Sequence, residues 1–462
     1  MSPRPIDLVI RGKRVFTAGP GMGGERPAAV HIERGVIRAV TELADIGDIP
    51  AGVPVIDAGD LHVLPGLVDT HVHINEPGRT EWEGFDTATR AAAAGGVTTL
   101  VDMPLNSIPP TTTLEGLRSK VDALEQKARV DVALCGGLVR SNPLGLAELW
   151  KEGVLSFKCF LAESGVDEFA YVDEAALRAG MRELAKIDAP LFVHAELPEP
   201  LSEGEKAALG LDPRKYETYL KSRPRRAEDA AIGLVLRLAK ETGARAHVVH
   251  LSSSDALDTF RRAREGNVAL TVETCPHYLT FAAEEIPDGA TEYKCAPPIR
   301  ERNNRERLWD ALREGMIDQV VTDHSPATVE LKCSGSGDFM KAWGGISSLQ
   351  IGLSAVWTEA RARGRTVRDL VHWMSAAPAR LAGLSAKKGA IAVGHDADLV
   401  FWDPEAEHTI DPATLEHRNK ITPYKGRALR GAVMRTILRG ETIYERGVGF
   451  GAGPRGRWLR RV

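Results

Sequence analysis

The chain has 462 residues, of which 43% are hydrophobic and 26% are charged, and its formal net charge is -4. This balance is typical of a globular protein and gives no electrostatic argument for binding nucleic acid or a membrane, so a small molecule is the expected partner. The length exceeds what one small core needs and predicts a large domain with a smaller one beside it.

The N-terminal region predicts short strands separated by Gly and Pro, at residues 6–16, 28–40 and 53–66. From residue 63 the pattern changes to apolar, often β-branched runs that alternate with helical stretches rich in Ala, Leu and Arg. Strand candidates occupy residues 62–74, 97–105, 130–138, 155–162, 189–197, 246–253, 269–279 and 317–326. Eight such units favour a closed (β/α)8 TIM barrel over an open doubly wound sheet, although a strand count alone leaves closure open.

After a last helical stretch at residues 367–383, the chain returns to β character in residues 388–404 and 432–447. We therefore expect both chain ends to form one small β-sandwich. The expected domains are residues 1–62 and 385–462 for the sandwich and 63–384 for the barrel. An insertion at residues 198–224 is expected to form surface loop and helix, and the basic tail at 455–462 is expected to be solvated or to contact another subunit.

Five scattered cysteines, Cys135, Cys159, Cys275, Cys295 and Cys333, lack paired spacing and favour a reducing compartment over a disulfide framework. The N-terminal stretch lacks the apolar core of a signal peptide, and no run approaches the ~18 apolar residues of a membrane span. We expect a cytoplasmic protein that does not bind membranes.

Metal-type residues cluster at the ends of the predicted strands, where (β/α)8 barrels carry their catalytic residues. They are His71 and His73 after the first strand, His194 after the fifth, His250 after the sixth and Asp323 after the eighth. Each histidine alone could be structural, but together the imidazoles and the carboxylate suit zinc or another divalent first-row metal.

Lys158 lies in the apolar fourth strand, where an ammonium group is costly to bury. One interpretation is a lysine that extends its amine to the strand end. The other is a neutral amine beside divalent cations, which could take up carbon dioxide and become an anionic carbamate able to bridge two metals.

The segments DTHVHINEPG (69–78), FKCF (157–160), VHAE (193–196), VVHLSS (248–253) and VTDHSP (321–326) resemble the amidohydrolase superfamily. Within it they are similar to the cyclic amidases, which are the dihydroorotases, hydantoinases and allantoinases. The resemblance implies two divalent ions per subunit, with zinc first and cobalt, manganese or iron as alternatives. It assigns one ion to His71, His73, N6-carboxylated Lys158 and Asp323, and the other to the bridging carbamate, His194 and His250. Asp323 would be the catalytic acid and base in hydrolysis by a metal-bridging hydroxide.

Residues beside these ligands discriminate among the cyclic amidases. Asn75 stands where dihydroorotases carry an arginine, and Glu163 stands where hydantoinases carry a tyrosine that serves as the oxyanion donor. Longer pieces, at residues 75–85, 102–112, 157–169, 274–281, 294–300 and 323–332, resemble allantoinases, which open the hydantoin ring of allantoin to give allantoate. The alternatives are a hydantoinase or dihydropyrimidinase acting on another cyclic ureide and, more remotely, a non-catalytic scaffold relative.

The candidate substrate contacts are Asn75, Asn106 and Glu163, each of which could instead support loop structure, and the main chain around Cys295 and Gly345. His277 is at most a residue that supports the ligands without binding a metal itself. The histidines His31, His62, His372, His395, His408 and His417 are expected to be structural or at the surface. The resemblance also implies a homo-oligomer, a tetramer in most members of this family.

Overall fold

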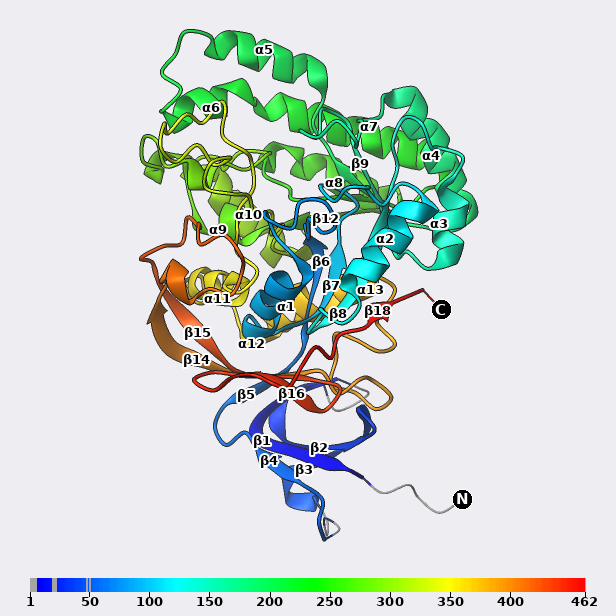
Figure 1. Cartoon of the computed structure of the whole chain (residues 1–462), viewed down its shortest axis with the longest axis vertical. Coiled ribbons are helices and arrows are strands. Elements are labelled where there is room, and N and C mark those ends of the chain that lie inside the picture. Colours follow the sequence, from blue (N-terminus) through cyan, green and yellow to red (C-terminus); the bar gives the residue numbers. More distant parts are fainter. Residues whose placement is uncertain (1–5, 19–22, 47–48, 50, 462) are drawn as a thin grey trace.

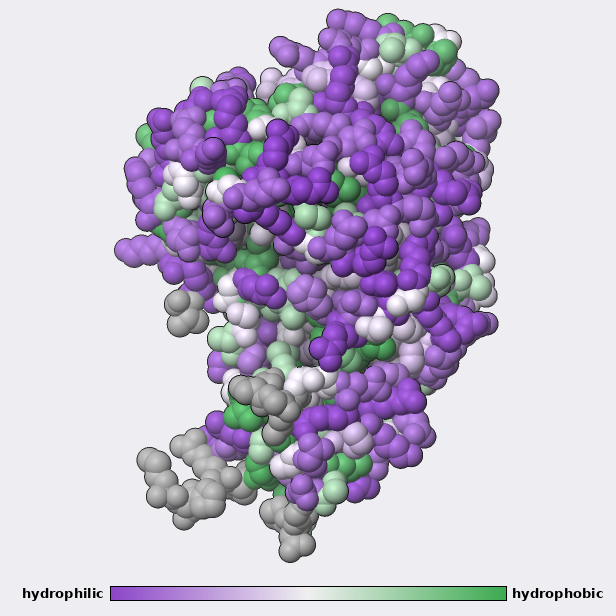
Figure 2. All heavy atoms as spheres, turned by 180° about the vertical axis from the view of Figure 1, so that it is seen from behind, coloured by the Kyte–Doolittle hydropathy of each residue, from purple (hydrophilic) through white to green (hydrophobic). Residues whose placement is uncertain are grey.

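The computed structural model describes residues 6–18, 23–46, 49 and 51–461. Residues 1–5, 19–22, 47–48, 50 and 462, which belong to the chain ends expected to form the sandwich, lie outside the described residues. No helix in the described part of the chain is long and apolar enough to cross a membrane. Figure 2 shows one face of the molecule as mostly hydrophilic, with its hydrophobic residues in small groups.

Eight parallel strands form the centre of the fold, and each lies within a strand predicted from the sequence. They are β6 (Leu67–Val72), β7 (Val97–Asp102), β8 (Asp131–Gly137), β9 (Ser156–Phe160), β10 (Leu191–His194), β11 (Ala246–Val248), β12 (Leu270–Thr274) and β13 (Gln319–Val320). The first and last strands meet, because Val72 forms a parallel bridge with His324 and the His73 N–H donates to the His324 carbonyl at 2.9 Å. These contacts confirm the predicted (β/α)8 barrel.

One outer helix follows each barrel strand (Figure 1). In chain order these helices are α1 (Phe85–Ala94), α2 (Leu114–Leu124), α3 (Leu146–Glu152), α4 (Glu174–Lys186), α7 (Arg225–Thr242), α8 (Leu257–Glu265), α10 (Arg302–Arg313) and α11 (Gly352–Ala362). Local chemistry sets their ends. The Asp173 carboxylate accepts the Ala176 N–H at the start of α4, and Gly243 ends α7 with φ 71°, a left-handed conformation that glycine adopts without strain.

Further helices extend this pattern. The insertion after β10 forms α5 (Pro198–Ala208) and α6 (Tyr216–Ser222), α9 (Pro276–Thr280) follows β12, and α12 (Val367–Val371) and α13 (Ala377–Leu381) flank a π-helix at His372–Ala376. The α5–α6 pair lies at the end of the molecule opposite the second sheet (Figure 1).

Both chain ends build a second, nine-stranded sheet, as predicted. Its strands are β1 (Leu8–Thr17), β2 (Gly24–Glu33), β3 (Val36–Glu42), β4 (Val55–Asp57), β5 (His62–Pro65), β14 (Leu399–Thr409), β15 (Ala428–Leu438), β16 (Glu441–Glu445) and β17 (Gly449–Phe450). The two ends join at β5, which pairs with β1 on one side and with β14 on the other. Buried residues from both ends, including Val30, Val63 and Leu399, form its core.

The predicted strand at residues 62–74 divides between the two sheets at Gly66. Residues before it belong to β5 and residues after it belong to β6. A Cβ atom at Gly66 would lie 2.1 Å from Thr98 Oγ1, so only glycine lets the chain pass β7 at this point.

A buried ion cluster joins the barrel to the second sheet. Lys388 Nζ lies 2.7 Å from Asp131 of β8, 2.7 Å from Asp398 and 2.9 Å from Asp396. The lysine is 3% exposed, and the neighbouring carboxylates hold its pKa above the ordinary value although burial opposes them. The cluster therefore ties β8 to the chain just before β14.

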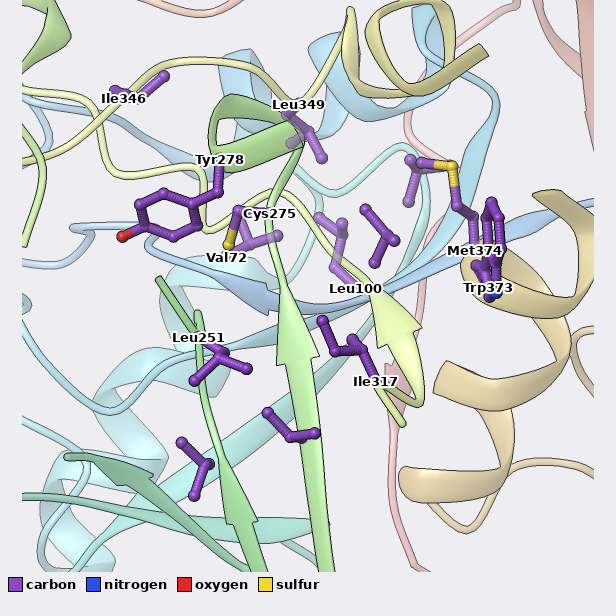
Figure 3. Close-up of a cluster of buried hydrophobic side chains, with 14 of the residues drawn as sticks. Val72, Leu100, Leu251, Cys275, Tyr278, Ile317, Ile346, Leu349, Trp373 and Met374 are labelled. Carbon is purple, nitrogen blue, oxygen red and sulfur yellow. The ribbon is translucent and has the colours of Figure 1, made fainter. Parts of the chain in front are cut away.

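The basic tail exposes its arginines to solvent, in line with one of the two expectations, but it is also anchored to the barrel. Its strand β18 (Trp458–Leu459) pairs in parallel with β8, where Trp458 lies opposite Val132. Aliphatic side chains such as Val72, Leu100, Leu251 and Ile317 belong to a buried hydrophobic cluster that also contains residues of the outer helices, among them Phe85 and Leu117 (Figure 3). This packed core supports the strand ends that carry the candidate site.

Candidate metal centre and active site

The structure brings all six predicted ligand residues together at the carboxyl ends of the barrel strands. His71 lies in β6, Lys158 in β9, and His194 is the last residue of β10. His73, His250 and Asp323 lie just after β6, β11 and β13. Because side chains alternate along a strand, His71 and His73 share one side of β6, and their ring centroids are 5.4 Å apart.

The six side chains form two neighbouring groups. In the first, His71 Nε2 lies 3.0 Å from Lys158 Nζ and 3.2 Å from Asp323 Oδ1, and His73 Nε2 lies 3.4 Å from the same oxygen. In the second, His194 Nδ1 faces His250 Nε2 at 3.0 Å. The groups adjoin, because the His71 and His250 rings stack with centroids 5.4 Å apart.

Two of these residues adopt a backbone conformation that residues other than glycine rarely take. His250 has φ 42° and Asp323 has φ 45°. Such left-handed positions cost on the order of 1–3 kcal/mol each and cluster at functional sites. Here they turn the chain sharply at the strand ends where His250 and Asp323 join the other ligand residues.

Burial favours the neutral form of the nitrogen donors. It lowers the pKa of His73 to about 4, and it lowers the pKa of His194 and His250 below the ordinary value for histidine. It also lowers the pKa of the Lys158 amine, which is fully buried. For Asp323 burial acts in the opposite direction, but the surrounding His71, His73 and Lys158 side chains hold its pKa below the ordinary range. The site therefore offers neutral nitrogen lone pairs and one ionised carboxylate.

This donor set fits a pair of divalent ions. Nδ1 of His73 and Nδ1 of His250 are buried without a hydrogen-bond partner among the described residues. His71, His250 and Asp323 each place a ligand atom within 4.8 Å of the others. Neutral imidazoles with a carboxylate are ligands that zinc and related divalent metals accept.

Two buried carboxylates that sequence reasoning missed orient the histidines. Glu273 Oε1 lies 2.5 Å from His71 Nδ1, and Glu196 Oε2 lies 2.9 Å from His194 Nε2. Each carboxylate accepts the ring N–H, which leaves the other nitrogen, Nε2 of His71 and Nδ1 of His194, free toward the ligand cluster. Glu196 was visible in the VHAE motif, two residues after His194, whereas Glu273 lies 202 residues from His71 and left no local signal.

Glu273 belongs to a longer hydrogen-bonded chain inside the barrel. Its Oε2 atom lies 2.9 Å from His247 Nε2, and His247 Nδ1 lies 2.8 Å from Thr271 Oγ1. The imidazoles of His71 and His247 hold the pKa of Glu273 below the ordinary value, although burial acts the other way. The carboxylate therefore remains ionised beside the candidate ligand His71.

A pocket of about 230 Å³ opens onto the ligand cluster. Four of the five predicted substrate contacts, Asn106, Glu163, Cys295 and Gly345, line it. Asn75 does not. It is fully buried and its Oδ1 accepts a hydrogen bond from Asn106 Nδ2 at 3.1 Å, so it supports a pocket residue.

The pocket also contains residues that the sequence did not single out. Tyr219 of α6 and Arg223 come from the insertion expected to be surface loop and helix. Tyr219 donates its hydroxyl to the Cys295 carbonyl at 2.7 Å, and Arg223 pairs with Glu196. The insertion thus closes one side of the pocket. Its polar composition is typical of a surface loop and did not indicate this long-range contact.

His277 lies close to the site but not in the pocket lining. Cys275, His277 and Asp323 place one ligand atom each within 4.8 Å, and both ring nitrogens of His277 lack a hydrogen-bond partner within the described ranges. The histidines expected to be structural or at the surface all lie outside the pocket, namely His31, His62, His372, His395, His408 and His417.

Comparisons with known proteins agree with this geometry. The amidohydrolase family model matches residues 62–443. The chain is 54% identical over 456 residues to the allantoinase of Streptomyces avermitilis, covering 99% of both chains. It is 45% identical over 453 residues to the allantoinase of Arabidopsis thaliana, covering 95% of this chain and 88% of that one.

A solved structure shows the same fold. The L-hydantoinase (dihydropyrimidinase) of Arthrobacter aurescens superimposes with a TM-score of 0.92 at 31% identity, covering 99% of this chain and 100% of that chain. The strand-end cluster, the matching family model and these full-length relatives show that the chain belongs to the amidohydrolase family.

Proposed function

We propose that the protein is an allantoinase, which uses water to open the hydantoin ring of allantoin and releases allantoate. The observation that carries this proposal is the convergence of four imidazoles, Lys158 and Asp323 at one end of the barrel, beneath a small pocket. The full-length similarity to allantoinases supports allantoin as the ring.

The two groups of side chains would hold one divalent ion each. His71, His73 and Asp323 surround one position, His194 and His250 surround the other, and Lys158 reaches His71 between them. When bound, the ions supply an acidified water and a Lewis acid for the ring carbonyl. Zinc suits these donors, and cobalt, manganese and iron are the alternatives.

Lys158 would connect the two positions as a carbamate. Burial lowers the pKa of its amine, so the neutral nitrogen can attack carbon dioxide. A nitrogen–carbon bond forms and one proton leaves, which converts an amine into an anion with two oxygens. This change also removes the cost of an ammonium group beside two cations.

Asp323 would move the proton. One of its oxygens accepts the proton that water loses as a carbon–oxygen bond forms at the ring carbonyl. The same carboxyl group then donates this proton to the ring nitrogen as the carbon–nitrogen bond breaks. The ring opens to a ureide and a new carboxylic acid, which ionises. The low pKa of Asp323 keeps its carboxylate ready to accept a proton at neutral pH.

The pocket would select the substrate by its polar lining. Asn106 and Glu163 would meet the ureido side chain, with Asn75 supporting Asn106, and the main chain at Cys295 and Gly345 would face the ring. These contacts suit a neutral cyclic ureide.

We further propose a cytoplasmic homotetramer, and the five unpaired cysteines support a reducing compartment.

The test is hydrolysis by metal-loaded protein, with allantoate measured directly and with hydantoin, dihydrouracil and dihydroorotate assayed in parallel. We expect turnover of allantoin to exceed that of every other ring. A preference for hydantoin or dihydrouracil would instead identify a hydantoinase or dihydropyrimidinase. Inactivity on all four rings, with both metals verified, would reject the proposal.

A further inference from the structure

The roof of the pocket is an irregular segment held by two buried lysines. The segment of residues 340–345 contains neither helix nor strand, and its residues 341–345 line the pocket beside Lys294 and Cys295. Such a segment has no ladder of backbone hydrogen bonds to hold it, so side chains must satisfy its buried carbonyl groups.

Lys332 joins both sides of this roof. Its Nζ atom donates to the carbonyl oxygens of Gly345 at 2.6 Å, Trp343 at 3.0 Å and Lys294 at 3.3 Å. An ammonium group has three donors, and each one finds an acceptor here. The residue is 4% exposed, so these carbonyls take the place of water.

Lys294 makes the reciprocal connection. Its Nζ atom donates to Ala342 at 2.6 Å and Met340 at 3.2 Å, and it lies 4.9 Å from the ring centre of Tyr219. The Gly345 N–H also donates to the Lys294 carbonyl at 2.8 Å. The roof and the chain at Lys294 and Cys295 are therefore joined in both directions.

Neither lysine forms an ion pair with a carboxylate in the part of the chain that the structure describes. Burial lowers the pKa of Lys294 to about 7 and that of Lys332 to about 8. A methionine would fill similar volume without this cost. The role that explains two buried amines is to supply hydrogen-bond donors to the roof.

The position of the roof affects the substrate side of the pocket directly. Gly345 has φ 144°, and a Cβ atom there would lie 2.2 Å from the carbonyl oxygen of Ser325, two residues after Asp323. Tyr219 holds the Cys295 carbonyl from the opposite side. A shift of the roof would move the main chain at Gly345 and Cys295, which lines the pocket.

We propose that Lys332 and Lys294 are positioning residues that fix the main chain of Gly345 and Cys295 over the pocket and thereby set its selectivity among cyclic ureides. This inference rests on the proposed function. The lysines act through the main chain, so they affect binding and ring preference more than the proton transfer at Asp323.

The test compares Lys332→Met, Lys332→Gln and Lys294→Gln with the unchanged holoenzyme. Lys186→Met, on the outside of α4, is the control. We expect KM for allantoin to rise about 10- to 100-fold, since a hydrogen bond from a charged donor is lost, while kcat changes much less. Metal content should stay at two ions, and the ratio of kcat/KM for hydantoin to that for allantoin should rise.

Amide hydrogen exchange supplies a readout that needs no substrate. Exchange should accelerate in the peptide that contains residues 340–345, and the control should leave it unchanged. Unchanged exchange together with unchanged KM would overturn the proposal, as would an equal loss of kcat and metal. If the parent enzyme fails to hydrolyse allantoin, the exchange data still decide whether the lysines hold the roof. If Lys332→Met does not fold, Lys294→Gln carries the same test.

Discussion

The Nε2 atom of His71 lies 3.0 Å from the Nζ atom of Lys158, although 87 positions separate the two residues in the sequence. One comes from the first barrel strand and the other from the fourth. Glu273 holds the far side of the His71 ring, so the nitrogen that faces the lysine keeps its lone pair. This contact places the amine that would become the carbamate beside the ligand nitrogen of His71.

Replacing Lys158 with Ala should abolish the bridge between the two metal positions. Loss of a residue that hydrogen-bonds to a metal ligand typically lowers metal affinity or activity by about 10- to 100-fold. Loss of a bridging ligand should therefore reduce allantoin hydrolysis by more than about 100-fold. Metal analysis after gel filtration should find fewer than two ions per chain. Lys151→Ala, at an exposed position in α3, serves as the control. A Lys158→Ala protein with both metals and full turnover would show that no carbamate is needed.

Glu273→Gln should weaken metal retention while leaving the fold intact. The neutral amide holds the His71 N–H less strongly than the carboxylate does, and about 10- to 100-fold of metal affinity should be lost. The measurement is the chelator concentration that removes half of the metal, with circular dichroism as the check on folding. Glu265→Gln, on the surface of α8, should match the parent protein. Equal chelator resistance in both variants would contradict the orienting role.

Asp323→Asn should remove the proton carrier. An amide cannot accept the proton from water, and general acid–base groups contribute about 10²- to 10⁴-fold to rate, so kcat should fall within or beyond that range. The measurement is single-turnover hydrolysis of allantoin with the metal content of the variant determined alongside. A variant that keeps metal and hydrolyses allantoin at the parent rate would place the proton transfer on another residue.

Lys388→Met should destabilise the junction between the barrel and the second sheet. The substitution leaves the buried Asp398 and the partly exposed Asp396 without their lysine, while Asp131 keeps its contact with Arg439. Removing one partner of a buried ion pair typically costs about 3–5 kcal/mol, so the free energy of unfolding should fall by that amount. Denaturant melts measure it, with the exposed neighbour Lys387→Met as the matched control. Equal midpoints for the two variants would mean that the ion cluster contributes nothing to stability.

The free energy of unfolding should change with pH in the alkaline range because the buried Lys332 amine loses its proton there. Burial lowers its pKa from 10.5 to about 8, so between these values the unfolded chain binds a proton that the folded chain has released. The free energy of unfolding of the parent protein should therefore rise, relative to Lys332→Met, as pH increases from 8 toward 10.5. Melting temperatures of both proteins across this range measure the effect. A difference that stays constant with pH would show that the amine titrates normally.

The eight strands of the barrel could be predicted because buried parallel strands carry continuous apolar runs, as in residues 130–138 and 155–162. The histidine and aspartate ligand candidates were also visible, since strand ends converge in any such barrel and four of the eight runs end in metal-type side chains. Local pattern therefore sufficed for the fold class and for proposing His71, His73, His194, His250 and Asp323 as ligands, whereas the role of Lys158 was implied by the family resemblance.

The pocket walls depended on contacts between distant segments, which no local pattern reveals. The insertion at residues 198–224 is as polar as a surface loop, yet it brings Tyr219 and Arg223 into the pocket. The tail at residues 455–462 is basic like a solvated segment, yet β18 pairs with β8.

The sequence by itself determined the alternation of strands and helices and the chemical identity of the donor atoms, because periodicity and residue type are local properties. Only the tertiary structure decided which nitrogen of His71 and of His194 faces the cluster, through Glu273 and Glu196, and how Lys294 and Lys332 hold the roof. Hydrogen bonds between residues far apart in the chain are set by barrel closure and loop packing, so their partners appear only when the fold is complete.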